Sequence, residues 1–248
     1  MTYTLGLCYT FIMATDNIMH YNKHFQMERE NMSDSFYKII YKPGTGEIVE
    51  KKSRFISNVY NIENEEQVSS YINAIKKKYW DARHNCFAFV LGDNNEMQRC
   101  SDDGEPTGTA GKPILDVILR SEIHNCLIIV TRYFGGTLLG TGGLVRAYGK
   151  ASKIGLENST ILEKQFGNIV KIVTDYNGLK KIQYIAGQMN LDILEIEYSD
   201  IVTITIVISV DIIKEFEKKI TESLAGKVVL QYAGDQYFAY DNGKFIKL

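Results

Sequence analysis

Hydrophobic and polar positions follow two different periods along the first 158 residues, and each period predicts one kind of element. Apolar residues spaced three and four apart predict amphipathic helices; the expected ranges are 63–80, 113–120 and 141–158. Short alternating or continuous apolar runs predict strands; the expected ranges are 46–61, 84–92, 97–101 and 126–133. Pro113 is expected at the first position of its helix, and Thr141 as the N-cap of the helix that follows.

From residue 159 the alternation becomes cleaner and predicts a second domain. Every second residue from Val202 to Val210 is valine or isoleucine. Alternate residues of a strand share one face, so we expect this face to be buried in a hydrophobic core. The expected strands are 169–176, 191–198, 202–210 and 227–240, and the expected helices are 179–189 and 212–220. This βαββαβ order is that of a ferredoxin-like domain. We therefore expect an α+β protein with a boundary between residues 159 and 165, and domains at 32–160 and 161–248.

The first 31 residues show no clear period. They are expected to be a disordered arm or the product of an overextended translation start. The sequence leaves the translation start open among Met1, Met27 and Met32, and an overextended start would mean Met27 or Met32.

Composition and charge exclude several classes of protein. The chain has 248 residues, 45% of them hydrophobic and 23% charged, which is typical of globular proteins and not of disordered or collagen-like chains. With 28 Lys+Arg against 30 Asp+Glu, a nucleic-acid site would have to be a local patch. Four widely spaced cysteines without a C-x-x-C pair favour a reducing cytoplasm. No apolar run reaches the roughly 18 residues of a membrane span.

Nine of the 20 glycines lie between Gly104 and Gly149, and the first part of this segment is acidic. Residues 101–113 look like a phosphate loop, but prolines occupy positions 106 and 113, where that motif needs glycine and a hydroxyl. The carboxylates of Asp102, Asp103 and Glu105 could hold a divalent cation. Turn formation and helix capping explain the same residues.

The second glycine-rich segment, 131–146, follows an expected strand and opens an expected helix. Free backbone N–H groups in that position bind anions. The helix carries a basic stripe at i, i+4 and i+7. The candidate contacts for phosphates or an acidic surface are Lys112, Arg132, Tyr133, Phe134, Gly135, Gly136, Gly142, Gly143, Arg146, Lys150 and Lys153. The alternative is a solvated helix face behind a tight turn.

A repeated tripeptide suggests two further chemistries. His84-Asn85-Cys86 recurs as His124-Asn125-Cys126, so the four side chains could form a zinc set. A histidine and a cysteine on one strand face could also form a nucleophile pair, but no third, orienting group is evident. The zinc set is disfavoured because His124 lies in a loop and Cys126 in an apolar strand. The nucleophile pair is disfavoured because neighbours on one strand face need not be hydrogen-bonded to each other.

Several motifs together resemble the IMPACT/YigZ family. They are RHNCFAF at 83–89, SDDGEP at 101–106, GTAGKP at 108–113, TRYFGG at 131–136 and LVRAY at 144–148. The resemblance implies a first domain with the fold of domain 2 of ribosomal protein S5, followed by a ferredoxin-like domain, as in domains IV and V of the factor EF-G. The family motif falls on His84, Cys86, Asp102, Asp103, Glu105, Lys112, Arg132, Tyr133, Arg146 and Tyr148.

The resemblance also implies a role, because eukaryotic members of the family regulate translation. We expect a cytoplasmic, non-enzymatic protein, without cofactor, metal or membrane partner, that binds RNA, the ribosome or a translation-related protein through its glycine-rich face. One alternative is an enzyme for a small phosphorylated or anionic substrate, with a metal at the Asp102–Glu105 turn and His84 as acid or base. Another is a protein-interaction module that uses the open face of the C-terminal sheet. The sequence leaves the oligomeric state open.

Overall fold

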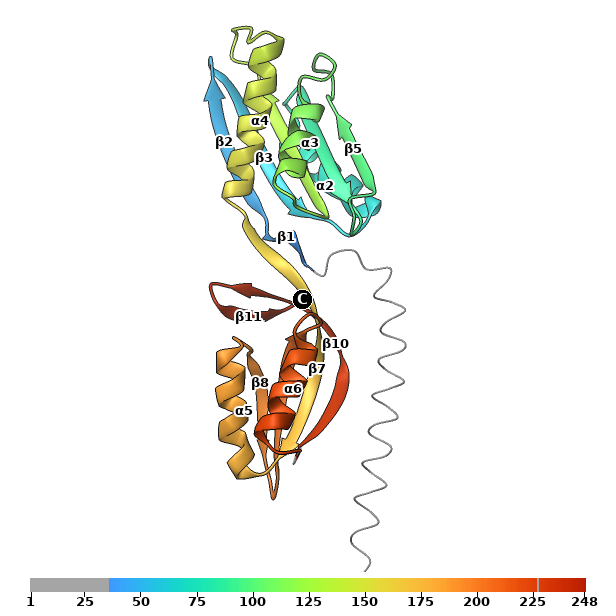
Figure 1. The fold of residues 1–248 in the computed structure, drawn as a ribbon. Coiled ribbons are helices and arrows are strands. Elements are labelled where there is room, and N and C mark those ends of the chain that lie inside the picture. Colours follow the sequence, from blue (N-terminus) through green and yellow to red (C-terminus); the bar gives the residue numbers. More distant parts are fainter. Residues whose placement is uncertain (1–35, 227) are drawn as a thin grey trace, which may run out of the picture. The chain divides into compact units, whose positions relative to one another are not determined.

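The computed structural model describes residues 36–226 and 228–248, so the arm expected at residues 1–31 and the candidate starts lie outside the described residues. The chain forms two compact units, one of them Tyr37–Lys164 and the other containing Gln165–Leu248 (Figure 1). The division falls inside the long strand β7 (Thr160–Thr174). The two units are described separately below.

The first unit is built on a five-stranded antiparallel sheet in the order β2-β3-β6-β4-β5. Its strands are β2 (Gly44–Glu50), β3 (Ser53–Asn61), β4 (His84–Leu91), β5 (Met97–Ser101) and β6 (Cys126–Tyr133). Its helices are α2 (Glu65–Lys78), α3 (Gly111–Arg120) and α4 (Thr141–Glu157). A further strand, β1 (Phe36–Lys42), reaches this unit through a bridge between Lys38 and Ile123.

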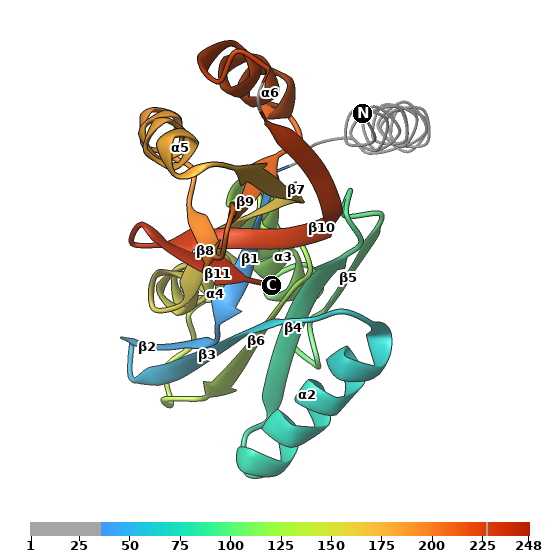
Figure 2. The ribbon, with the colours of Figure 1, turned by 90° about the horizontal axis from the view of Figure 1, so that it is seen from below.

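Helices cover both faces of this sheet, with α3 and α4 on one face and α2 on the other (Figure 2). The α3–α4 side holds the larger core, in which Phe55, Ile114, Ile128 and Tyr148 are fully buried. The smaller core under α2 contains Ile62 and other apolar residues. Because β6 is covered on both sides, its apolar run is continuous, as the sequence predicted.

Three local expectations for the first unit are wrong. The range 46–61 is a hairpin of two strands that turns at Lys51 and Lys52, both in the left-handed region with φ of 45° and 67°. The N-cap of α4 is Gly140, with φ of 73°, so Thr141 is the first helical residue. Helix α3 begins at Gly111, two residues before Pro113, because Asp102 supplies acceptors for its first N–H groups.

The second unit has the ferredoxin-like arrangement that its hydrophobic pattern predicts. After β7 come α5 (Tyr176–Gln188), β8 (Ile193–Tyr198), β9 (Val202–Ser209), α6 (Ile213–Ser223), β10 (Val229–Asp241) and β11 (Lys244–Lys247). The antiparallel strand order is β11-β10-β7-β9-β8. The alternate residues from Val202 to Val210 are buried, and those from Val202 to Ile208 lie in the core that α5 and α6 cover. Strand β11 was not predicted from the sequence.

Candidate functional site

The strand register brings four segments together at one end of the first unit's sheet. Tyr133, the last residue of β6, pairs with Arg54 near the start of β3, and Arg132 pairs with His84 at the start of β4. The connections before β3 and β4 and after β6 therefore share one end, where α4 begins (Figure 1). We call this the loop end; it comprises segments 51–52, 79–83, 102–110 and 134–143.

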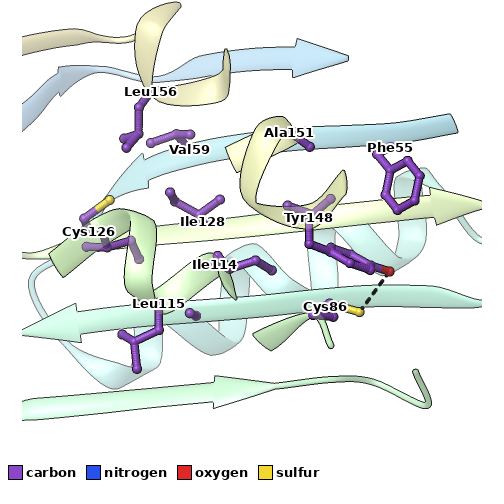
Figure 3. Close-up of a cluster of buried hydrophobic side chains, with 14 of the residues drawn as sticks. Phe55, Val59, Cys86, Ile114, Leu115, Cys126, Ile128, Tyr148, Ala151 and Leu156 are labelled. Carbon is purple, nitrogen blue, oxygen red and sulfur yellow. Dashed lines mark hydrogen bonds between the residues drawn. The ribbon is translucent and has the colours of Figure 1, made fainter. Parts of the chain in front are cut away.

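A buried polar network lies beneath the loop end. The Arg132 guanidinium donates to Glu105 Oε1 across 2.6 Å, and both side chains are almost completely buried. The Tyr148 hydroxyl donates to the same oxygen at 2.8 Å, and Cys86 Sγ lies 3.3 Å from that hydroxyl (Figure 3). The guanidinium also sits 5.4 Å from the centre of the Phe55 ring.

This network corrects the expected role of Arg132. A phosphate can bind only a guanidinium that is accessible to solvent. The guanidinium of Arg132 is buried against Glu105 and is therefore not accessible to a phosphate. The ion pair instead joins β6 to the acidic segment 102–110, and Tyr148 joins that segment to α4. Three of the family-motif residues thus hold the framework together, and we leave Arg132 out of the proposed anion-binding surface.

Burial also settles the chemistry of Cys86. Its thiol is fully buried, and this burial raises its pKa to about 12. The thiol is therefore protonated at neutral pH, whereas a nucleophilic cysteine needs the thiolate. The nucleophile pair with His84 is not supported, and His84 Nδ1 instead lies 2.9 Å from the carbonyl oxygen of Asp103.

The acidic segment is a capping and turn structure. Asp102 accepts hydrogen bonds from the backbone N–H groups of Gly108, Ala110 and Gly111 at 2.8–3.0 Å, which caps the start of α3. Desolvation raises the pKa of Asp102, but these three bonds outweigh it and leave the pKa below its ordinary value. Asp103 accepts from the backbone N–H of Asn85 at 2.7 Å and forms an ion pair with Lys76.

These contacts do not fit a metal at this turn, since each of the three carboxylates is engaged by a donor of the protein itself. Within the described ranges, no three histidine, cysteine, aspartate or glutamate side chains gather in a group that could hold an ion. The zinc set fails on register, because Cys86 pairs with Val130 and Cys126 with Val90. Four positions along a strand separate the two thiols by roughly 13 Å, too far for one zinc ion.

The start of α4 presents unsatisfied backbone donors at the loop end. Gly140 provides no side-chain cap, and the first helical hydrogen bond to it comes from Leu144. Among the hydrogen bonds of the described residues, none is donated by the N–H of Gly142 or of Gly143. Gly135 differs from the expectation, because its N–H donates to Ser53 Oγ at 3.1 Å. A helix start with free N–H groups attracts anions.

Exposed cations lie in the segments that meet at the loop end and in the two helices that end or begin there. Seven Lys and Arg side chains at the loop end, in the last turn of α2 and in the first half of α4 have no carboxylate within 4 Å among the described residues: Lys51, Lys52, Lys77, Lys78, Arg83, Arg146 and Lys150. Of the other predicted cations, Lys112 pairs with Asp116 at 3.0 Å and Lys153 with Glu157 at 3.6 Å.

Sequence reasoning missed five of these seven cations. Lys77 and Lys78 end α2, which is far from α4 in the chain, so local sequence does not connect them with the glycine-rich segment. The β4–β6 register is the signal that joins them, since it places the α2–β4 connection beside the loop after β6. The Tyr133 hydroxyl donates to Asp81 at 2.7 Å across this junction.

Exposed apolar side chains lie among the cations. Phe134 is half exposed, and Leu138 and Trp80 are each 82% exposed. Tyr133, predicted as a stacking residue, is half-buried and holds Asp81, so Phe134 is the accessible ring of that pair. Flat exposed rings beside cations are the features that bind single-stranded nucleic acids.

Fold and site together define a two-domain α+β protein with a ferredoxin-like second unit and an internal Arg–Glu–Tyr network under a basic, glycine-rich end. The Impact N-terminal domain model matches residues 51–156, and the model of a domain of unknown function, DUF1949, matches residues 172–227. The chain belongs to the IMPACT family. Between residues 36 and 248, apart from residue 227, no helix has the length and apolarity to cross a membrane.

Two curated relatives match most of the chain. IMPACT family member YvyE of Bacillus subtilis is 38% identical over 191 residues, which cover 77% of this chain and 88% of that protein. IMPACT family member YigZ of Escherichia coli is 34% identical over 182 residues, which cover 73% of this chain and 89% of that protein. The crystal structure of a hypothetical protein is similar with a TM-score of 0.53 and 32% identity, covering 80% of this chain and 97% of that one.

Proposed function

We propose that this chain is a cytoplasmic, non-enzymatic regulator of translation that binds RNA through the loop end of its first unit. The observation that carries the proposal is the set of seven cations without a carboxylate partner at the loop end and in the adjoining turns of α2 and α4, in a protein whose net charge is −2. Such a local concentration of positive charge suits a phosphate backbone. Membership of the IMPACT family supports the translational role, which the resemblance implies for eukaryotic members.

The residues assigned to phosphates differ from those the sequence indicated. Arg146 and Lys150 on α4, with the N–H groups of Gly142 and Gly143, form the centre of the surface. Lys112 and Lys153 lie at its margin, where each already has a carboxylate partner. Arg132 contributes indirectly, because its guanidinium lies 5.6 Å from the centre of the Phe134 ring and packs against that ring from the protein side.

The test is equilibrium binding of a fluorescein-labelled single-stranded RNA to the full chain, followed by anisotropy. Replacing Arg146 and Lys150 together by Ala is expected to weaken binding by roughly tenfold or more, because two charge-assisted contacts are lost. Lys38→Ala is the matched control, since this exposed lysine lies beside Ile123 at the opposite end of the sheet.

The proposal fails if the double variant binds like the wild type, or if Lys38→Ala weakens binding equally. Absence of RNA binding together with a specific protein partner would favour the interaction-module alternative.

A further inference from the structure

Trp80 is the least explained side chain of the loop end. It is the protein's single tryptophan, and 82% of its surface is exposed although tryptophan is usually well buried. It lies in the connection between α2 and β4, and no ring of the described residues stacks on it. An exposed indole of this kind is a candidate contact for a partner.

The connection that carries Trp80 is held in place. The N–H of Ala82 donates to the Tyr79 carbonyl at 3.0 Å, and the carboxylate of Asp81 accepts from the Tyr133 hydroxyl at 2.7 Å. The second bond links the residue after Trp80 to the residue before Phe134. The two exposed rings therefore belong to adjoining, anchored segments.

The charges around Trp80 indicate the chemistry of its partner. Lys77, Lys78 and Arg83 flank it in sequence and have no carboxylate within 4 Å among the described residues. The nearest acid in sequence, Asp81, is held by Tyr133. Lys78 Nζ lies 5.0 Å from the centre of the Tyr79 ring, and this contact leaves its charge without a counter-ion. An apolar ring among cations that lack a carboxylate partner fits a ligand that offers both flat bases and phosphates.

We propose that the α2–β4 connection is a base-stacking subsite for single-stranded RNA. An unpaired base stacks on Trp80, and Lys77, Lys78 and Arg83 contact the phosphates on either side. The ligand must be single-stranded because the bases of a duplex already stack on one another and offer no free face. The inference rests on the proposed RNA binding and extends it from the start of α4 to a second segment of the loop end.

The single tryptophan gives a direct readout, because all indole fluorescence of the full chain comes from residue 80. Titration with a ten-residue oligouridylate is expected to quench this fluorescence, whereas a duplex RNA of equal length is expected to leave it nearly unchanged. By anisotropy with labelled oligouridylate, Trp80→Ala is expected to weaken binding by roughly tenfold, and Trp80→Phe to restore most of it.

Tyr184→Ala is the matched control, since Tyr184 is an equally accessible ring, 66% exposed, on α5 of the second unit. It is expected to bind like the wild type. If the RNA binds and depends on Arg146 and Lys150, while the indole signal and the Trp80→Ala affinity stay unchanged, the subsite is refuted and the proposed function stands. If the RNA does not bind at all, both are refuted.

Discussion

Replacing Glu105 by Gln tests whether the ion pair under the loop end is structural. The substitution keeps the size of the side chain and leaves an oxygen for Tyr148, but it removes the charge that compensates Arg132. The side chains of both partners are under 10% exposed, so solvent cannot replace the lost partner. Breaking one half of a buried pair costs about 3–5 kcal/mol of unfolding free energy.

Urea unfolding followed by circular dichroism measures this loss. With a slope of about 1.5 kcal/mol per molar urea, a loss of about 3 kcal/mol lowers the midpoint of the first unit's transition by about 2 M. Glu47→Gln is the control, because Glu47 forms a similarly short pair with Arg54 at 2.7 Å on an exposed surface. The control is expected to cost less than about 1 kcal/mol.

The double variant Glu105→Gln, Arg132→Met completes the test. It replaces the whole pair by neutral groups, so it is expected to be less destabilised than the sum of its single variants. The structural assignment would be wrong if Glu105→Gln cost no more than Glu47→Gln, or if Arg132→Met weakened RNA binding without lowering stability.

Two further predictions concern the neighbouring groups. Asp102 has a lowered pKa in the folded protein, so it contributes stability above its ordinary pKa of 3.8 and loses that contribution as pH falls through the folded value. Asp102→Asn is therefore expected to lower the urea midpoint at pH 7, and the difference in midpoint between variant and wild type should become smaller below about pH 4. A difference that stays constant with pH would argue against Asp102 as the charged cap of α3. For the cysteines, iodoacetamide at about pH 8 is expected to modify exposed Cys100 in the native protein and spare Cys86, whose pKa burial raises to about 12. Equal labelling, read by mass spectrometry, would contradict that burial.

Elements bounded by clear changes of pattern were predicted well from the sequence. Strands β5 and β6 begin and end where expected. For β6 the reason is its continuous apolar run between polar residues, which has few alternatives to a buried strand. The β2–β3 hairpin was missed because its turn consists of Lys51 and Lys52, and lysine gives no turn signal comparable to glycine or asparagine. Strand β11 is too short to show a period.

The site was harder to predict because burial depends on contacts between distant residues. Arg132 and Glu105 are 27 residues apart, and only the folded sheet brings them together. A guanidinium looks like a surface cation in sequence, so its role was misassigned. Trp80 and Arg83 were overlooked for a related reason, as their nearness to the glycine-rich loop follows from strand register and not from local sequence.

The salt dependence of RNA binding tests the central claim most directly. Each phosphate contact to a single strand contributes about −0.7 to the slope of log affinity against log salt concentration. A strand that contacts four or five of the loop-end cations therefore gives a slope of about −3, and affinity falls by roughly sixtyfold from about 50 to about 200 mM salt. We predict this steep fall for the wild type and a shallower slope when Arg146 and Lys150 are both replaced by Ala. An affinity that does not change with salt would contradict binding through the loop end.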